Sequence, residues 1–364
     1  MPSAAAGRAA AARARAAAGK LFSRRSSEVV PASTVRRRVD PMSTPVRIAV
    51  IGAGRVAPEH LRVLAAFGDV EVVGLANRGG PGIEEMAARF GVRRTFSDWR
   101  AMVEQTEPDG VLVLVDPFST AGVVADVLRL GIPALVEKPP GMTSGETEEL
   151  AALAEDRGVT SLVAVNRRWY SVVQAALARV TAHGPLIGVS VDAPEPVAQI
   201  ARSPGRPPEL LDRWLVANTI HAIDLLRYAG GPFGAVHAVR RASGEGASDS
   251  FCALVEFESG ALGQFSSHWR SPGKWRLQLD GTGIQAVLEP FERGSLRLED
   301  GRTEPLLRDP VDVEFKPGFY AQDRAFVEAV GRKEGLSDPA SDLADAVQSM
   351  RLAEAIAGLE VRVP

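Results

Sequence analysis

Apolar runs of strand length alternate with segments of helical spacing through the first half of the chain. From residue 46, each apolar run is followed by a segment that reads as a helix, and a glycine often closes it. The predicted strands cover residues 46–51, 71–76, 111–115, 133–137 and 161–165, and the predicted helices cover residues 56–67, 82–90, 120–130 and 143–157. This alternation predicts a doubly wound parallel sheet.

After about residue 165 the pattern changes to consecutive strands joined by short turns. Helices at 170–182 and 208–229 are predicted on either side of a proline-rich loop at 194–208. The strands expected next cover residues 235–243, 250–258, 261–269, 274–280, 284–290 and 294–299, and helices return at 318–332 and 339–357. Strands that follow one another with short turns indicate an antiparallel sheet. We therefore expect a doubly wound α/β domain followed by an α+β domain with an open antiparallel sheet.

The pattern divides the 364 residues into four segments. They are a disordered basic leader at 1–44, a first domain at 45–165, a second domain at 166–338, and a C-terminal helix and tail at 339–364 that packs back on the body. Residues 1–41 carry a net charge of +7, so the remainder carries −10. Three interpretations of the leader stand: a translated upstream region before a true start at Met42, a functional tail, or a targeting segment.

Composition limits the classes of function. No apolar run reaches the roughly 18 residues of a membrane span, and the net charge of −3 gives no reason to expect nucleic acid as a partner. The five histidines are scattered, so no metal site is expected. The single cysteine, Cys252, lies in an apolar run and is expected to be a buried small side chain. The 37 arginines against five lysines, with many Ala, Gly and Pro, favour a bacterial cytoplasmic protein.

A glycine-rich turn follows the first predicted strand. Gly52, Gly54 and Ala57 form G-x-G-x-x-A between a strand and a helix, the context in which this fingerprint binds a dinucleotide. Gly52 permits the tight turn, Gly54 lets a pyrophosphate approach the backbone at the helix N-terminus, and Ala57 lets the helix pack closely on the strand. The first domain is therefore expected to be a Rossmann domain.

The end of the second strand indicates which dinucleotide is preferred. An acidic residue there would accept the ribose 2′-hydroxyl of NAD, but the strand runs into Asn77 and Arg78. A guanidinium can pair with a 2′-phosphate and stack on adenine. The alternative is a solvated loop arginine. We expect NADP as the preferred cofactor, with NAD as the alternative.

Two further groups of polar residues are candidates for chemistry. Lys138 ends a parallel strand, where ligands of such sheets bind, and two prolines follow it. Burial beside other cations could lower its pKa towards acid–base use. Asn218, His221 and Asp224 are spaced i, i+3, i+6 on a predicted helix and would share one face. Such a trio in an apolar stretch needs partners.

Four motifs in order carry a family resemblance: the glycine-rich turn, Glu137-Lys138-Pro139, Asn166-Arg167-Arg168-Trp169 and His221-x-x-Asp224. With them, residues 46 to about 360 resemble the Gfo/Idh/MocA oxidoreductases, among them glucose–fructose oxidoreductase and inositol dehydrogenase. The resemblance implies reversible hydride transfer between NAD(P) and a hydroxyl or keto carbon of a sugar, cyclitol or nucleotide-sugar. It also implies a homo-oligomer, a dimer or tetramer, formed through the open sheet.

The expected site has three parts. The catalytic residues would be Lys138, His221 and Asp224. The cofactor-binding residues would be Gly52, Gly54, Arg55, Val56, Asn77, Arg78, Pro117, Glu137, Lys138 and Asn166. The substrate-binding residues would be Lys138, Arg167, Asn218 and His221.

The chain departs from the family at one position. Members commonly carry Asp four residues before the histidine, where Ala217 stands here. Either acid–base work falls on Lys138 and His221, or catalysis is weak. A non-catalytic dinucleotide-sensing regulator and a reductase of a non-carbohydrate, such as a pyrrole or imine, are therefore the alternatives. Retention of Lys138 and His221 favours the enzyme, because a sensor needs neither.

Overall fold

The structure is a computed structural model that describes residues 44–79, 82–202, 207–244 and 247–358. The expected leader up to residue 43 and the last six residues of the expected C-terminal tail lie outside these ranges.

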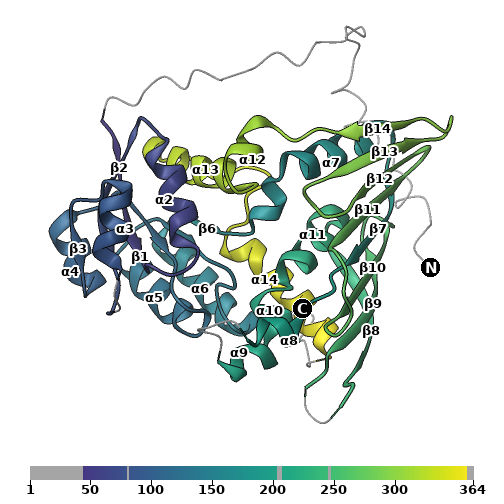
Figure 1. Ribbon diagram of the computed structural model, residues 1–364, viewed down its shortest axis with the longest axis horizontal. Coiled ribbons are helices and arrows are strands. Elements are labelled where there is room, and N and C mark those ends of the chain that lie inside the picture. The colour runs from purple at the N-terminus through teal and green to yellow at the C-terminus, as the bar shows by residue number, and fades with distance from the viewer. Residues whose placement is uncertain (1–43, 80–81, 203–206, 245–246, 359–364) are drawn as a thin grey trace, which may run out of the picture. The chain divides into compact units, whose positions relative to one another are not determined.

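The first sheet is parallel and confirms the predicted Rossmann topology. Its strands run in the order β3-β2-β1-β4-β5-β6 (Figure 1). Their bounds are β1 (Val46–Ile51), β2 (Val70–Ala76), β3 (Thr95–Phe96), β4 (Gly110–Val113), β5 (Ala134–Val136) and β6 (Ser161–Val163). Helices on both faces bury these strands, which explains their continuous apolar runs. The strand order reverses between β1 and β4, and ligands of such sheets bind beyond the carboxyl ends of the strands at that point.

The helices around this sheet include one from far along the chain. Those between its strands are α2 (Ala57–Ala65), α3 (Ile83–Phe90), α4 (Trp99–Thr106), α5 (Pro117–Arg129) and α6 (Ser144–Arg157). In addition, α13 (Phe319–Arg332) contacts α2 and β1. Its Phe326 and Val327 share a core with Ile48 and Leu61. A helix that the sequence pattern assigns to the second domain therefore completes the core of the first.

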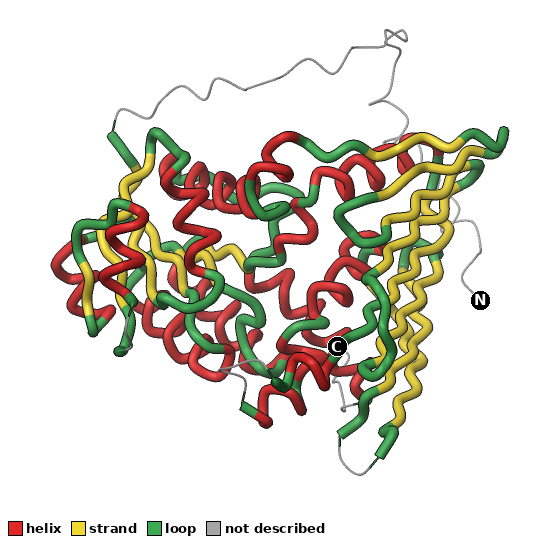
Figure 2. The backbone as a smooth tube through the Cα atoms, in the orientation of Figure 1, coloured by secondary structure: helices red, strands yellow, loops and turns green. Residues whose placement is uncertain are grey.

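The second sheet has eight strands and confirms the predicted antiparallel sheet, with one parallel pair in its middle. Its order is β14-β13-β12-β11-β7-β10-β9-β8 (Figure 2). The bounds are β7 (Leu186–Asp192), β8 (Phe233–Arg241), β9 (Ser250–Phe257), β10 (Leu262–His268), β11 (Arg276–Gly281), β12 (Ile284–Leu288), β13 (Gly294–Leu298) and β14 (Thr303–Leu306). The pair β7–β10 is parallel and all others are antiparallel. The sequence analysis missed the central strand β7, which follows a helix rather than a hairpin turn.

Helices cover one face of this sheet. They are α7 (Ser171–His183), α11 (Ile220–Gly230) and α14 (Leu343–Ala357), which pack on β11, β7 and β8 respectively (Figure 1). In β9, buried and exposed residues alternate strictly. Cys252 belongs to the exposed set, so the expectation that it is buried is wrong. An apolar run in a strand buries only every second side chain when the sheet is covered on one face.

The predicted helix at 208–229 is divided into three: α9 (Pro208–Asp212), α10 (Trp214–Ala217) and α11. Asn218 lies in the break before α11, with φ −130° and ψ −48°. The i, i+3, i+6 spacing predicted that Asn218 shares a helical face with His221 and Asp224. Because of the break, it does not share that face. Shorter elements elsewhere are η1 (Asn166–Trp169), α8 (Val197–Ile200) and α12 (Pro310–Glu314).

Candidate active site

A groove of about 780 Å³ opens at the carboxyl ends of β1, β2 and β4. Four of the expected cofactor-binding residues line it: Gly52, Gly54, Asn77 and Arg78. The groove also takes in Trp99 at the start of α4 and Phe118 in the first turn of α5. It coincides with the crevice where the strand order reverses.

The two glycines of the turn have different reasons to be glycine. Gly52 has φ +106°, and a Cβ on it would lie 2.3 Å from the carbonyl oxygen of Leu114, so the turn itself excludes a side chain. A Cβ on Gly54 would have no described atom within 4 Å, because it would point into open space. The Val56 N-cap of α2 makes no side-chain capping bond. A bare backbone beside an uncapped helix N-terminus fits a pyrophosphate.

Arg78 and Asn77 lie at the end of β2, on the rim of the groove. The Nη2 atom of Arg78 donates to Ser119 Oγ at 3.1 Å, and its guanidinium is exposed. Asn77 Nδ2 donates to the carbonyl oxygen of Gly79 at 3.0 Å. Arg55 is exposed in the glycine-rich turn. Pro117 begins α5 between two groove-lining residues, Asp116 and Phe118.

Lys138 follows β5 and reaches towards the second part of the chain. Its Nζ donates to the carbonyl oxygen of Ala217 at 2.8 Å. Burial lowers the pKa of Lys138 to about 8; the negative charge of Glu137 opposes this effect, and the positive charge of Arg167 adds to it. An amine with this pKa can exchange a proton near neutral pH.

His221 lies in the first turn of α11 and is buried. Among the described residues its Nδ1 atom has no hydrogen-bond partner. Burial lowers the pKa of His221 well below its usual value, and the positive charges of Arg167 and Lys138 add to the effect. The imidazole is therefore neutral, and it lies close enough to Lys138 for the charge of the lysine to affect its pKa. Two of the three expected catalytic groups are thus brought together.

Arg167 adds a positive group beside them. Its guanidinium lies 5.5 Å from the ring centre of Trp275, and its Nη1 donates to Asn166 Oδ1 at 2.8 Å. Asn166 Nδ2 donates in turn to the carbonyl oxygen of Pro317 at 3.0 Å. The Asn166 amide thus fixes both Arg167 and the loop that carries Lys316, and its expected role in cofactor binding stays a prediction.

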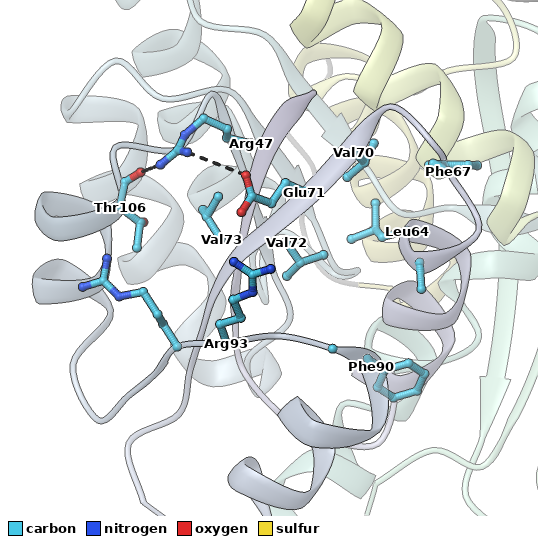
Figure 3. Close-up of a pocket in the computed structure, with 13 residues that line it drawn as sticks. Arg47, Leu64, Phe67, Val70, Glu71, Val72, Val73, Phe90, Arg93 and Thr106 are labelled. Carbon is cyan, nitrogen blue, oxygen red and sulfur yellow. Dashed lines mark hydrogen bonds and ion pairs between the residues drawn. The ribbon is translucent and has the colours of Figure 1, made fainter. Parts of the chain in front are cut away.

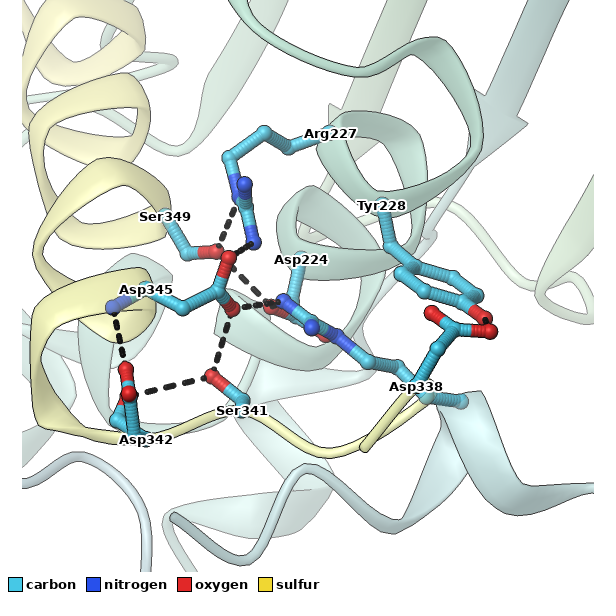
Figure 4. Close-up of polar contacts among 9 residues, drawn as sticks. Asp224, Arg227, Tyr228, Asp338, Ser341, Asp342, Asp345 and Ser349 are labelled. Atoms are coloured by element: carbon cyan, nitrogen blue, oxygen red, sulfur yellow. Dashed lines mark hydrogen bonds and ion pairs between the residues drawn. The ribbon is translucent and has the colours of Figure 1, made fainter. Parts of the chain in front are cut away.

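Asp224 lies three residues after His221 on α11, and its carboxylate is held in a buried ion pair. Both of its carboxylate oxygens accept from Arg168, at 2.8 and 2.6 Å, and Ser349 Oγ donates to it at 2.7 Å. Figure 4 shows Asp224 within a polar network that includes Arg227 and Asp345. These contacts give the carboxylate a role in holding α11 to η1 and α14, and its expected catalytic part stays a prediction.

The sequence analysis missed three charged residues of this region. Glu195 is 3% exposed, and its Oε1 accepts from Asn218 Nδ2 at 2.8 Å. Lys316 has a pKa lowered by burial and by the charge of Arg167. His60, on α2, lies 4.0 Å from the carboxylate of Glu137 and hydrogen-bonds to Asp323 at 2.8 Å. None of them has a motif spacing to the others, so no local signal marked them.

A second pocket, of about 490 Å³, lies at the opposite edge of the first sheet, beside the first residues of β1 and β2 (Figure 3). Arg47 and Glu71 both line it, and Arg47 Nη1 lies 3.8 Å from Glu71 Oε2. It contains none of the expected site residues. Within the described ranges, no group of three His, Cys, Asp or Glu could hold a metal ion. In the same ranges, no helix is both long and apolar enough to cross a membrane.

Comparisons with known proteins give sequence relatives and a structural match. Over 112 residues the chain is 33% identical to the rhizopine catabolism protein MocA of Rhizobium meliloti, a match that covers 31% of this chain and 35% of that protein. It is 24% identical to 4-carboxy-2-hydroxymuconate-6-semialdehyde dehydrogenase of a Sphingobium strain, over 84% of this chain and 96% of that one. Levoglucosan dehydrogenase in complex with NADH and L-sorbose shares the fold, with a TM-score of 0.75 and 18% identity over 86% and 96% of the two chains.

Two family models match successive parts of the chain. Residues 46–166 match the model of the oxidoreductase family with an NAD-binding Rossmann fold, and residues 190–286 match the Gfo/Idh/MocA C-terminal domain. The first match contains β1 to β6 with the glycine-rich turn, and the second contains β8 to β11 of the mixed sheet with parts of β7 and β12. The chain is an oxidoreductase of the Gfo/Idh/MocA family.

Proposed function

We propose that this protein transfers hydride between NADP and a hydroxyl or keto carbon of a carbohydrate-like molecule, that is, a sugar, cyclitol or nucleotide-sugar. The observation that carries the proposal is the pairing of Lys138 and His221. A lysine with a pKa of about 8 and a buried neutral imidazole with a free Nδ1 lie within electrostatic reach of each other. The sugar complex of levoglucosan dehydrogenase, which has this fold, supports the substrate class.

The cofactor supplies the hydride acceptor or donor, and the chain's own residues manage the proton. In the oxidation direction, neutral Lys138 would take the proton from the substrate hydroxyl oxygen. His221 would hydrogen-bond to the same oxygen and orient it. Arg167, held over Trp275, keeps the surroundings positive and so favours the negative charge that develops on that oxygen. In the reduction direction the protonated lysine would return the proton.

The cofactor preference is a second part of the proposal. The groove suits a dinucleotide because Gly52 and Gly54 leave its backbone bare and α2 begins beside them. Arg78 at its rim would pair with the 2′-phosphate of NADP, and its present partner there is a serine hydroxyl. Arg55, Val56, Asn77 and Pro117 would complete the cofactor contacts, with Glu137, Lys138 and Asn166 at the nicotinamide end.

The test is a screen of sugars and keto-sugars with NADP and NAD, followed by variants at the two central residues. Lys138→Met and His221→Ala should each lower kcat by about 10²–10⁴-fold while cofactor affinity changes little. The two losses should not add, because the groups act on one oxygen. Lys274→Met and His183→Ala, at exposed positions, are the matched controls and should retain full turnover.

The screen also separates the alternatives. A reductase of a non-carbohydrate would oxidise NADPH only with imine or pyrrole compounds. Cofactor binding without turnover on a broad panel, unaffected by either variant, would contradict the proposal and favour a dinucleotide-sensing regulator.

We further propose that copies of the chain associate through the uncovered face of the mixed sheet, as a dimer or tetramer. Val239, Leu254 and Leu262 on its strands are 60–66% exposed. Apolar side chains gathered on one sheet face are typical of an interface. Light scattering should show a dimer or tetramer that Leu254→Lys dissociates; a monomeric parent would contradict this. The expected cytoplasmic location stays a prediction.

A further inference from the structure

Glu195 is a buried carboxylate beside the proposed site that the proposed chemistry does not use. It follows β7, where its amide donates to the carbonyl oxygen of His268 at 3.3 Å. Its side chain is 3% exposed, and burial raises its pKa, an effect that hydrogen bonds from Asn218, Trp214 and Thr219 oppose. A buried acid has a desolvation cost that its contacts must offset. Two of these contacts, from Asn218 and Thr219, come from one short segment of the chain.

That segment is the break between α10 and α11. Glu195 Oε1 accepts from Asn218 Nδ2 at 2.8 Å and from Thr219 Oγ1 at 3.1 Å. The break starts the helix that carries His221, whose amide donates to the Asn218 carbonyl oxygen at 3.4 Å. One residue earlier, the Ala217 carbonyl oxygen accepts from Lys138 at 2.8 Å. The segment that Glu195 holds is therefore in contact with both residues of the proposed proton-handling pair.

Glu195 also contributes charge. The groups that act on the Lys138 amine are Glu137, which precedes it, Arg167 on η1, Lys316 after α12, and Glu195 after β7. The two cations disfavour the protonated amine and the two carboxylates favour it. Glu195 is the carboxylate of this set that comes from the second sheet, and Ala217 offers no side-chain charge of its own.

We propose that Glu195 is a positioning residue of the active site, which fixes the Asn218–Thr219 break by two hydrogen bonds and sets the charge that Lys138 faces. This inference rests on the proposed function. Family members commonly carry Asp at the position of Ala217. In this chain Glu195, in the loop after β7, would supply a carboxylate instead. The effect on Lys138 passes through the Ala217 carbonyl contact and through space, and no contact between Glu195 and substrate is required.

The experiment measures Lys138 directly as well as turnover. The chain has five lysines, so the rate at which each reacts with acetic anhydride can be followed by mass spectrometry as a function of pH. In the parent, Lys138 should show a midpoint near the pKa of about 8. Glu195→Gln keeps an oxygen that can accept from Asn218 and Thr219 but removes the charge. Glu209→Gln, at an exposed position of α9, is the matched control.

Glu195→Gln should move the Lys138 midpoint to lower pH, because a negative charge that favours the protonated amine is lost, and should move the acid limb of the kcat profile with it. Glu195→Ala also releases the break and should lower kcat by a further factor of about 10 to 100. If Glu195→Ala fails to fold, Glu195→Gln carries the test. A Lys138 midpoint and kcat profile that stay unchanged in Glu195→Gln would overturn the proposal. A shifted midpoint without any turnover would support it and count against the proposed function instead.

Discussion

Arg168 and Asp224 form a buried two-point ion pair that joins η1 to α11. Arg168 Nε and Nη2 donate to the two carboxylate oxygens at 2.8 and 2.6 Å, and each side chain is at most 2% exposed. Asp345 of α14 accepts from Arg168 at 2.7 Å and from Arg227 at 2.6 Å (Figure 4). Three elements that are distant in the sequence are thus held at one point.

Asp224→Ala should therefore destabilise the fold rather than remove a catalytic group. It leaves the buried Arg168 with Asp345 as its remaining ion-pair partner, and breaking such pairs costs about 3–5 kcal/mol. The free energy of unfolding, measured in urea, checks this. As a control, Glu304→Ala removes a surface pair with Arg179 and should cost about 1 kcal/mol or less. Unchanged stability together with lost turnover would return Asp224 to the catalytic set.

Arg78→Ala should weaken NADP binding far more than NAD binding. A charge-assisted contact with the 2′-phosphate is worth about 1.5–3 kcal/mol, or roughly 10- to 150-fold in affinity. Titration of both cofactors by fluorescence measures the ratio. Arg93→Ala is the control, because Arg93 is exposed and lines the pocket at the opposite edge of the sheet (Figure 3). Tighter binding of NAD than NADP to the parent would show that the assignment is wrong.

Gly54→Ala and Gly52→Ala should separate cofactor binding from folding. At Gly54 the new methyl group meets no described atom, so the melting temperature should stay near that of the parent while dinucleotide affinity falls by at least about tenfold, a loss of about 1.4 kcal/mol. At Gly52 the methyl group meets the Leu114 carbonyl oxygen in a backbone conformation that favours glycine, so stability should fall as well. Undiminished cofactor affinity in Gly54→Ala would place the pyrophosphate elsewhere.

His60 should make stability depend on pH. Burial by itself lowers its pKa, but the carboxylates of Asp323 and Glu137 together more than reverse this and raise the pKa to about 9. A pKa above the usual 6.5 means that the stabilisation is fully present below about pH 6.5 and is lost as pH rises through about 9. The free energy of unfolding should fall over this window, and His60→Gln should flatten the fall. The exposed-site variant His183→Gln should keep it. An equally steep fall in both variants would assign it to other groups.

Much of the fold was readable because its signals are local. The apolar runs ending at Ile51, Ala76 and Val136 predicted parallel strands, and the glycine-rich turn after the first of them predicted a dinucleotide groove. Strand length, helix spacing and turn glycines depend on neighbours within a few residues. They can therefore be predicted without knowledge of the tertiary structure. Lys138 and His221 were likewise found from their local contexts.

The tertiary structure decided what depends on residues far apart in the chain. It moved Asp224 into an ion pair with Arg168, 56 residues away, and brought Glu195 to Asn218 across 23 residues. It placed Cys252 on the uncovered face of a mixed sheet and α13 in the core of the first sheet. A buried charge is stable only beside a partner, and the partner is chosen by packing, not by sequence spacing. The sequence therefore determined the strands, the glycine-rich turn and the pair of candidate residues, and only the packed chain determined which charges surround them.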